Sequence, residues 1–446
     1  MKPSPQVHRA RSAGELPCGA SPGEHARRLT LAQGTALYVA AVLGTGVIAL
    51  PALAAAAAGP ASLLAWVALV VLSVPLAGTF AALAARYPDS GGVATYVRRA
   101  FGARAAAVVG WCFFFAIPAG APASALFAGD YVAAAFGGAH TVWITACVMI
   151  ATVAGLNALG VAVSGRVQLR LSVLLVGLLL LAVAASAPHA RLDNLHPFAP
   201  HGWAALERAA ALLVWSFAGW EAITHLAGEF RNPRTDLPRA AGMAVVVVGV
   251  LYLAVAGAIV SVLGMRAATS PAPLAALLSI GIGGPSPMFA AVAAVLLTFG
   301  TMNAYFAGAA KLGAALGRDG ALPAWLARGS QAGDVPRRSL GVLAVLSVLM
   351  LLLCSLADVD TTPLVLLTTG CFTLVYLLGT AAALRLLAPG SLAWVGACIA
   401  LIAVAGLLAA SGRYMVWPLL IGCGALTYQQ FRPAGVTSPR RAPGDT

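Results

Sequence analysis

Long apolar segments recur along the chain from residue 31 to residue 431, and short polar stretches separate them. Each is long enough for an α-helix that crosses a bilayer, which takes about 20 residues. None shows the alternation of polar and apolar positions that is typical of a transmembrane β-barrel strand. The pattern predicts twelve helical spans, at 31–58, 61–85, 105–136, 141–160, 167–187, 205–227, 239–264, 286–312, 340–356, 361–387, 391–410 and 414–431.

The two ends of the chain differ from this pattern. Residues 1–29 carry five Lys and Arg side chains among Pro, Ser and Gly, without the apolar stretch of a signal peptide. We expect them to form a disordered basic cytoplasmic tail, and residues 432–446 to form a second cytoplasmic tail. Residues 30–431 then make up a twelve-helix membrane domain, and we expect no soluble domain between the tails.

The composition agrees with an all-α integral membrane protein. Of the 446 residues, 60% are hydrophobic and 9% are charged, and the mean hydropathy is +0.90. A soluble protein of this length needs more charge to cover its surface. The net charge of +13 does not indicate a nucleic-acid partner, because the basic residues lie in short loops between apolar spans.

The basic residues also predict how the chain is oriented in the membrane. With the N-terminus in the cytoplasm, the outward-facing segments hold only four basic residues, Arg191, Arg208, Arg266 and Arg413. The other 23 of the 27 Lys and Arg residues then lie on the cytoplasmic side, as the positive-inside rule requires. We therefore expect a multi-pass protein of the cell membrane with both termini in the cytoplasm.

The sequence offers no pattern for a metal, a cofactor or a catalytic centre. Six of the seven Cys residues lie inside apolar spans, where they are typical small buried hydrophobes, and there is no CxxC motif. The seven His residues include no HExxH motif or clustered pair, so we expect neither an enzyme nor a metal site. The charged selectivity ring of a channel is also missing from the pattern.

Two spans contain weak points for a helix near their middle. The first is Gly44-Thr45-Gly46, and the second is the stretch from Phe217 to Glu221 in the sixth span. An interrupted helix in lipid leaves peptide groups that each cost several kcal/mol unless a polar cavity or ligand satisfies them. Spans one and six are equivalent positions in a five-plus-five inverted repeat with two extra helices, so the breaks favour that architecture over two parallel six-helix halves.

The breaks also suggest a ligand. A half-helix that starts near Gly46 points its amide groups and positive dipole end at the membrane centre, where a carboxylate is the natural partner. The bare carbonyl groups that end the preceding half-helices suit an ammonium group. Together they fit a zwitterion such as a free amino acid. The alternative is that the small residues only allow close helix packing and that Pro51 only kinks the helix.

Three polar residues inside the spans are candidates for coupling or gating. Glu221 lies near the middle of the sixth span, where a carboxylate is costly unless it handles protons or accepts hydrogen bonds from freed amides. His225 follows one turn later and either shares a proton with Glu221 or caps a network. Asn303 in the eighth span either faces the pathway or joins two helices by a hydrogen bond.

These segments resemble the amino acid–polyamine–organocation superfamily over residues 30–431. The resemblance is carried by a glycine-rich loop at Gly44–Pro51 and by four further motifs, at Tyr87–Tyr96, Trp215–Glu221, Glu229–Ala240 and Gly317–Pro323. Within the superfamily the chain is most similar to bacterial exporters of L-methionine and branched-chain amino acids. That narrower likeness rests on Leu31–Gly34, Leu43–Val47, Ile117–Gly120 and His225–Phe230.

The resemblance implies a LeuT-like fold and roles for the residues of both breaks. The substrate carboxylate would meet Thr45, Gly46 and Val47, and the ring of Trp215 would cover the substrate. The ammonium group would meet carbonyl groups around Val42, Leu43, Trp215 and Phe217. The remaining members of the expected binding site are Gly44, Ala218, Gly219 and Trp220.

The substrate and its coupling are also expectations. Because Glu221 is the one carboxylate placed deep in the spans, a cationic side chain is disfavoured and methionine, leucine, isoleucine or valine is favoured. We find no convincing pair of sodium-binding hydroxyl groups on spans one and eight, and no lysine within 171–187. Proton-coupled efflux is therefore the preferred interpretation, and uptake or exchange of amino acids by the same fold is the alternative.

Overall fold

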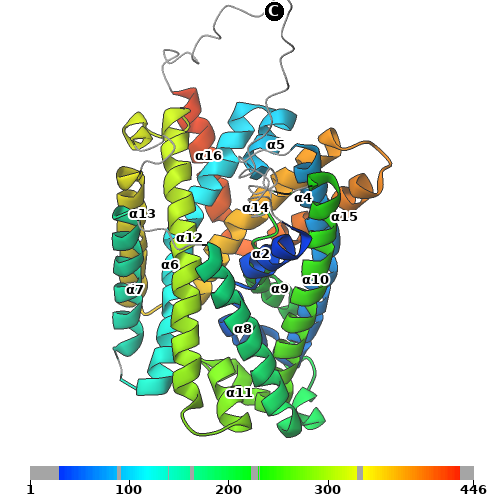
Figure 1. Ribbon diagram of the computed structural model, residues 1–446, viewed down its shortest axis with the longest axis vertical. Helices are drawn as coiled ribbons and strands as arrows, with labels where there is room; N and C mark the ends of the chain where they lie inside the picture. The colour runs from blue at the N-terminus through cyan, green and yellow to red at the C-terminus, as the bar shows by residue number, and fades with distance from the viewer. Residues whose placement is uncertain are drawn as a thin grey trace, which may run out of the picture.

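The computed structural model describes residues 30–87, 92–138, 140–160, 165–221, 230, 232–328 and 335–431. The elements assigned over these ranges are helices, drawn as coiled ribbons in Figure 1. Both predicted tails, 1–29 and 432–446, lie outside the described residues. The helices up to the sixth predicted span are α2 (Leu31–Leu43), α3 (Gly46–Ala58), α4 (Ser62–Arg86), α5 (Gly92–Phe101), α6 (Ala103–Phe136), α7 (Thr141–Ala158), α8 (Gly165–Ser186) and α9 (Ala205–Phe217).

The second half of the chain continues in the same way. Its α-helices are α10 (Pro233–Ala258), α11 (Pro273–Gly281), α12 (Ser286–Arg318), α13 (Arg337–Leu356), α14 (Thr362–Leu386), α15 (Leu392–Ala410) and α16 (Val416–Gln430). A π-helical turn, η5 (Ile259–Leu263), extends α10. Short 3₁₀ turns join other elements: η1 (Gly59–Ala61), η2 (Ala187–His189), η3 (Leu192–Leu195), η6 (Gly264–Thr269), η7 (Ala324–Ala327) and η8 (Gly412–Met415).

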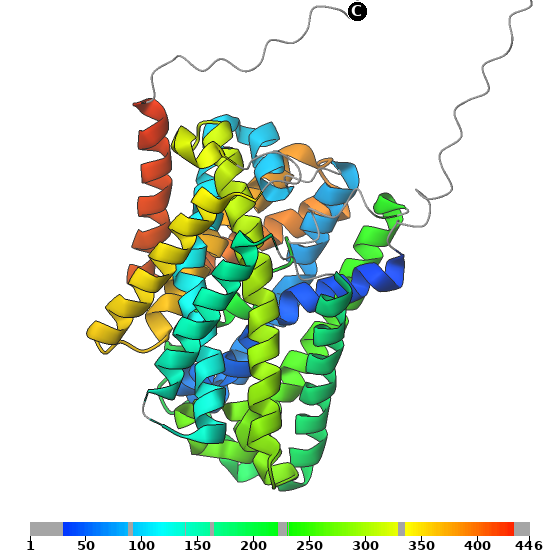
Figure 2. The ribbon, with the colours of Figure 1, turned by 60° about the vertical axis from the view of Figure 1, so that its left-hand side comes forward.

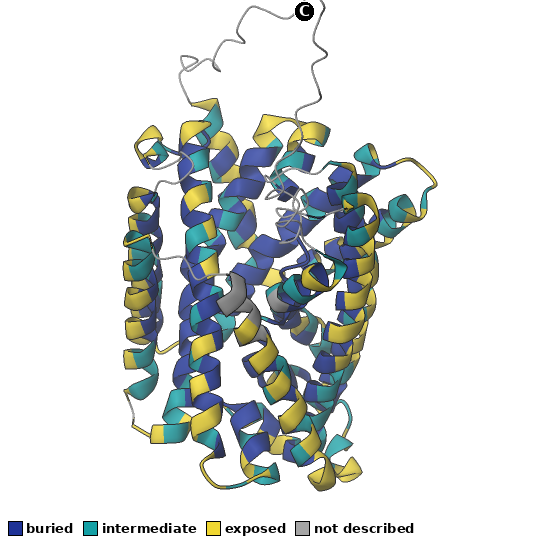
Figure 3. Cartoon of the chain, in the orientation of Figure 1, coloured by how far each residue is buried: buried dark blue, intermediate teal, exposed yellow. Residues whose placement is uncertain are grey.

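The chain is a multi-pass membrane protein. Eight helical stretches of the described residues are long and apolar enough to cross a bilayer, and two shorter apolar helices occur at Leu31–Leu43 and Val173–His189. Each of the twelve predicted ranges contains helical residues. Exposed residues gather on the outward faces of the peripheral helices (Figure 3), as expected where apolar side chains face lipid.

The first predicted span is interrupted where the sequence suggested. Helix α2 ends at Leu43 and α3 begins at Gly46, and Gly44 between them has a φ of 32°, a conformation that favours glycine. At the other end of α2, Thr30 and Gln33 form a capping box that fixes where the helix starts. Figure 2 shows α2 steeply inclined to the long helices, beside α10.

The sixth predicted span is interrupted as well. Helix α9 ends at Phe217, and residues 218–221 form turns. Gly219 has a φ of 126°, and a Cβ atom there would lie 2.8 Å from the carbonyl oxygen of Ala41. The two breaks therefore touch through a position that only glycine can occupy. The rest of the predicted span 205–227, with His225, lies outside the described residues.

Helices that are far apart in the sequence pack in pairs. Helix α3 packs on α9, α4 on α10, α6 on α12 and α7 on α13. Figure 1 shows the long α6 and α12 side by side, with α7 and α13 at one edge. Helix α6 also contacts α14, α7 and α16, so it forms the centre of the helical packing.

Some helices were not predicted. Helix α5 lies in the loop between the second and third spans, and it is amphipathic, because Val93, Tyr96 and Val97 are buried while Arg98 and Arg99 are exposed. Helix α11 lies between the seventh and eighth spans, and its nine residues are too few to cross a membrane. Helix α10 starts at Pro233, six residues before the predicted span, because proline is favoured in the first turn of a helix.

Candidate functional site

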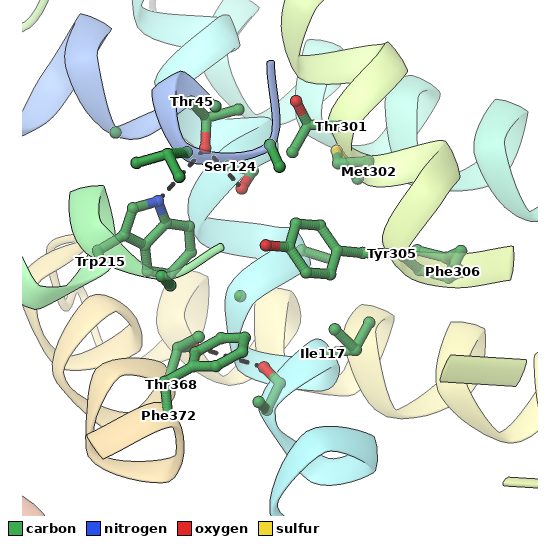
Figure 4. A pocket seen from close by; sticks show the side chains of 18 residues that line it. Thr45, Ile117, Ser124, Trp215, Thr301, Met302, Tyr305, Phe306, Thr368 and Phe372 are labelled. Carbon is green, nitrogen blue, oxygen red and sulfur yellow. Dashed lines mark hydrogen bonds between the residues drawn. The ribbon is translucent and has the colours of Figure 1, made fainter. Parts of the chain in front are cut away.

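A cavity lies beside the break between α2 and α3. Its walls come from this break, from α6, from the end of α9, from α12 and from α14, and Figure 4 shows it from close by. Its volume of about 50 Å³ is several times the roughly 10–15 Å³ that one water molecule requires. The cavity is thus large enough for several non-hydrogen atoms of a ligand.

One end of the cavity is polar. The Trp215 Nε1 donates a hydrogen bond to Thr45 Oγ1 over 3.4 Å, and Thr45 Oγ1 lies 3.3 Å from Ser124 Oγ. Helix α3 begins at Gly46 at the same place, so its first amide groups and its positive dipole end face this corner. The arrangement concentrates hydrogen-bond donors where an anionic group would be stabilised.

The opposite walls are mainly apolar. Ile117 on α6, Met302 and Phe306 on α12 and Phe372 on α14 line them, and Tyr305 adds an aromatic ring with one hydroxyl group. No Asp, Glu, Lys or Arg of the described residues lines this cavity. A charged side chain of a ligand would therefore be desolvated here without a partner, whereas an apolar one would be in contact with similar groups.

Glycine permits the close approach of α3 to α9. A Cβ atom on Gly46 would lie 2.6 Å from Ser216 Oγ and 3.0 Å from both the Ser216 Cα and the Trp215 Cδ1. Gly120 on α6 faces the same space, where a Cβ atom would lie 3.2 Å from Thr368 and 3.4 Å from Trp215. The small residues therefore hold three helices around the cavity at short range.

A cavity at two touching helix breaks, polar at one end and apolar at the other, is typical of membrane carriers. Comparison with known proteins shows to which family of carriers the chain belongs. Residues 29–389 match the amino acid permease family. The chain belongs to this family. Its members are transporters and not enzymes.

Three relatives of this permease cover different shares of the chain. An uncharacterized amino acid permease, YecA, from Bacillus subtilis (strain 168) is 33% identical over 405 residues, which are 91% of this chain and 96% of YecA. The L-methionine/branched-chain amino acid exporter YjeH from Escherichia coli (strain K12) is 33% identical over 395 residues, 85% of this chain and 92% of YjeH. The branched-chain amino acid permease BcaP from Bacillus subtilis (strain 168) is 27% identical over 248 residues, about half of each chain.

The cavity brings together about half of the binding residues that the sequence predicted for the permease. Its lining includes Val42, Gly44, Thr45, Gly46, Trp215 and Ala218. The other five predicted residues do not line it and are packed around it: Leu43, Val47, Phe217, Gly219 and Trp220. Phe217 lies against Trp66 and Tyr252, and Trp220 lies against Tyr38.

A tyrosine from α10 engages the ends of both interrupted helices. The Tyr252 hydroxyl lies 2.8 Å from the Val42 carbonyl oxygen and 2.6 Å from the Ser216 carbonyl oxygen. A hydroxyl group has one hydrogen to donate, so Tyr252 satisfies one of these carbonyl groups at a time. The other carbonyl oxygen keeps its capacity to accept a hydrogen bond from an ammonium group.

Glu221 is buried and bonded to the break in the sixth span. Its carboxylate accepts hydrogen bonds from the Gly219 amide over 3.0 Å and from the Tyr376 hydroxyl. The Tyr376 hydroxyl also lies 3.3 Å from the Phe217 carbonyl oxygen and accepts from the Gly219 amide over 3.1 Å. Glu221 and Tyr376 therefore hold the interrupted backbone, which fits the structural role considered for Glu221 and leaves a proton-handling role open.

The other two coupling candidates are placed differently. Asn303 is buried, and its side-chain oxygen accepts a hydrogen bond of 2.8 Å from Asn157 on α7. This contact corresponds to the interhelical bond considered for Asn303, and its neighbours Thr301 and Met302 face the cavity instead. His225 lies outside the described residues.

Several lining residues were missed by sequence reasoning. On α6, Ser124 follows Ile117 by seven residues and Gly120 by four, so all three share one helix face. Because Ile117 and Gly120 belong to a segment that carries the family resemblance, helical spacing could have found Ser124. The residues from α12 and α14, including Tyr305 and Thr368, had no comparable signal, because the sequence does not say which face of those helices is turned inwards. Among the described residues, no group of three or more His, Cys, Asp or Glu could hold a metal ion.

Proposed function

We propose that this permease carries neutral, apolar amino acids across the cell membrane by alternating access. The observation that supports this most is the division of the cavity into a donor-rich corner at Thr45 and Gly46 and an apolar wall at Ile117, Met302 and Phe372. The α-carboxylate would bind at the corner, and the ammonium group would meet a carbonyl oxygen such as that of Val42. The side chain would lie against the wall.

The helix packing supports an inverted five-plus-five repeat of twelve spans. If spans are numbered in chain order, the contacts of α3 with α9, α4 with α10, α6 with α12 and α7 with α13 join spans one and six, two and seven, three and eight, and four and nine. In each pair the two span numbers differ by five. Elements close to a two-fold axis pack against their own equivalents, so this series is expected when the second five helices repeat the first five.

Methionine, leucine, isoleucine and valine are the substrates that we propose. The cavity lining carries no charged side chain, so arginine, lysine and glutamate would lose their hydration without compensation. The relative YjeH is named as an exporter of L-methionine and branched-chain amino acids, and BcaP as a branched-chain amino acid permease. These names favour the same class of side chain.

Efflux coupled to protons is the direction and the energy source that we propose. The similarity to YjeH over 85% of the chain favours export, and Glu221 is a buried carboxylate next to the break in the sixth span. Uptake or exchange by the same fold is the second candidate, and the permease name of BcaP favours it. Both candidates use the same cavity.

Counterflow of labelled leucine into proteoliposomes tests the proposal. Vesicles loaded with unlabelled methionine should accumulate label, and excess valine but not lysine should compete. Gly46→Val should reduce the rate at least about thirtyfold, because it displaces α3 from α9 and removes a charge-assisted hydrogen bond worth about 2 kcal/mol. Gly308→Val is the matched control, since a Cβ atom at Gly308 meets no atom within 4 Å. Full counterflow in Gly46→Val would contradict the proposed site.

A further inference from the structure

A second and larger cavity lies at the ends of helices that we predict to face the outside. It has a volume of about 650 Å³, within the range of roughly 300–1,000 Å³ that is typical of small-molecule sites. Its walls come from the start of α9, from the start of α14 with the residues before it, and from the turn η8 between α15 and α16.

Four charged side chains line this outer cavity. Glu207 and Arg208 come from α9, Asp360 precedes α14, and Arg413 belongs to η8. All four belong to the part of the chain that the structure describes, and no ion pair joins any two of them. Two unpaired charges of each sign around one hollow are suited to a ligand that itself carries both signs.

Two of these charged groups are held by their neighbours. The Arg413 guanidinium lies over the Tyr414 ring at 5.2 Å and donates a hydrogen bond to the Tyr414 hydroxyl. The Asp360 carboxylate accepts hydrogen bonds from the Thr362 amide over 3.1 Å and from the Thr362 hydroxyl over 3.3 Å. A fixed cation and a fixed anion lose less conformational entropy on binding a ligand than free surface side chains do.

The outer cavity lies close to the cavity at the helix breaks. On α9, Ala211 lines the outer cavity, and Trp215 one turn later lines the inner one. On α14, Leu366 lines the outer cavity, and Thr368 two residues later lines the inner one. The two hollows are therefore about one helical turn apart along α9, where Trp215 belongs to the lining of the inner cavity.

We propose that the outer cavity binds the transported amino acid as a zwitterion before it enters, or after it leaves, the inner cavity at the helix breaks. The carboxylate would face Arg413 and Arg208, and the ammonium group would face Asp360 and Glu207. This inference rests on the proposed function, because it takes the same free amino acid as its ligand. It adds a second site to the pathway, and the breaks in the first and sixth spans have no part in it.

The test compares Michaelis constants at the two faces of oriented proteoliposomes. Arg413→Gln and Asp360→Asn should each raise the KM for external leucine about fivefold, the effect of about 1 kcal/mol from a partly exposed charged contact. The KM for leucine at the cytoplasmic face should stay within about twofold of that of the unmutated protein. Arg413→Lys should restore most of the external affinity. Arg266→Gln and Asp193→Asn remove exposed charges outside this cavity and should change neither KM.

Direct binding separates the two cavities. In the Gly46→Val background the inner site is blocked, and saturation-transfer NMR should still detect leucine on the purified protein. Adding Arg413→Gln to Gly46→Val should remove that signal. Loss of all binding in Gly46→Val would overturn the outer site.

Three transport results would also overturn the inference: an unchanged external KM, equal changes at both faces, or an effect that appears only with one phospholipid headgroup. The last result would mean that a lipid occupies the cavity. In each case normal counterflow by the unmutated protein would leave the proposed function intact. If the unmutated protein showed no counterflow, the proposed function itself would be wrong, and the outer site would lose its basis with it.

Discussion

At the scale of single residues, hydroxyl groups decide how the breaks are held. Thr45 receives the Trp215 Nε1 hydrogen bond and also contacts Ser124, so the residue just before the second half-helix is joined to α6 and α9. At the sixth-span break, the Tyr376 hydroxyl donates to Glu221 and accepts from the Gly219 amide. Side chains also satisfy peptide groups at the breaks: the Gly219 amide donates to Glu221 and Tyr376, and the Tyr252 hydroxyl lies 2.8 Å from the Val42 carbonyl oxygen, as burial in a membrane demands.

The role of Glu221 can be tested by comparing two substitutions. If Glu221 carries the coupled proton, Glu221→Gln should keep leucine counterflow and lose the response to an imposed pH gradient. Tyr376→Phe removes a hydrogen-bond partner of Glu221 but no titratable carboxylate, so it should slow counterflow and keep the gradient response. Gradient-driven leucine flux in proteoliposomes measures both. If both variants lose counterflow and gradient response alike, Glu221 is a structural support and the proton role is wrong.

At the scale of elements, a hydrogen-bonded tyrosine joins α3, the second half of the first span, to α11. The Tyr131 hydroxyl donates to the Ile48 carbonyl oxygen on α3 over 2.7 Å and accepts from the Leu274 amide of α11 over 3.2 Å. Helix α11 has only nine residues and also packs on α8 and α12. Its position therefore depends on tertiary contacts, since a helix this short is marginal by itself.

Removing that hydroxyl should loosen α11. In Tyr131→Phe the Leu274 amide loses its partner, so we expect its hydrogen exchange to rise about fivefold, the equivalent of about 1 kcal/mol. Tyr38→Phe is the matched control, because the buried Tyr38 hydroxyl has no hydrogen-bond partner among the residues that the structure describes. Hydrogen–deuterium exchange with mass spectrometry over the peptide that contains residues 273–281 measures the effect. Equal protection in both variants would show that α11 is held by apolar packing.

At the scale of the whole molecule, the charge distribution predicts the orientation in the membrane. In a variant without native cysteines, single cysteines at Arg191 and Arg266 should react with an impermeant maleimide added to intact cells. Cysteines at Arg104 and Arg328 should react only after the membrane is opened. All four positions are exposed, so a difference in labelling reports the side of the membrane and not burial. The opposite labelling pattern would reverse the predicted topology.

Much of the fold followed from the sequence, and the exceptions have physical reasons. Apolar length predicted where helices occur, and the glycines at 44 and 46 predicted the first break, because such features are local. Helix α5 was missed because a ten-residue amphipathic helix is too short and too polar for a search based on apolar spans. Helix α11 was missed because its position comes from contacts with distant helices.

The candidate site was predicted only in part, because local features are visible in the sequence and contacts between distant helices are not. Thr45, Gly46 and Trp215 line the cavity. The sequence predicted them because weak helix formers inside an apolar span indicate where a helix is interrupted. Phe217 and Trp220 were also expected at the site, and their rings pack against Tyr252 and Tyr38 and do not line the cavity. A side chain at a break can point to either side of the backbone, and only the neighbouring helices determine which.

The sequence by itself determined that the chain crosses a membrane many times, that two of its spans are interrupted, and that peptide dipoles at the first interruption suit a carboxylate. These properties depend on the hydrophobicity and helix preference of consecutive residues. Only the tertiary structure decided that Ser124 joins Thr45, that Tyr376 holds Glu221, and that Arg208, Asp360 and Arg413 line one hollow. Those contacts join residues more than 70 positions apart, and their geometry is set by how helices pack, which no local pattern encodes.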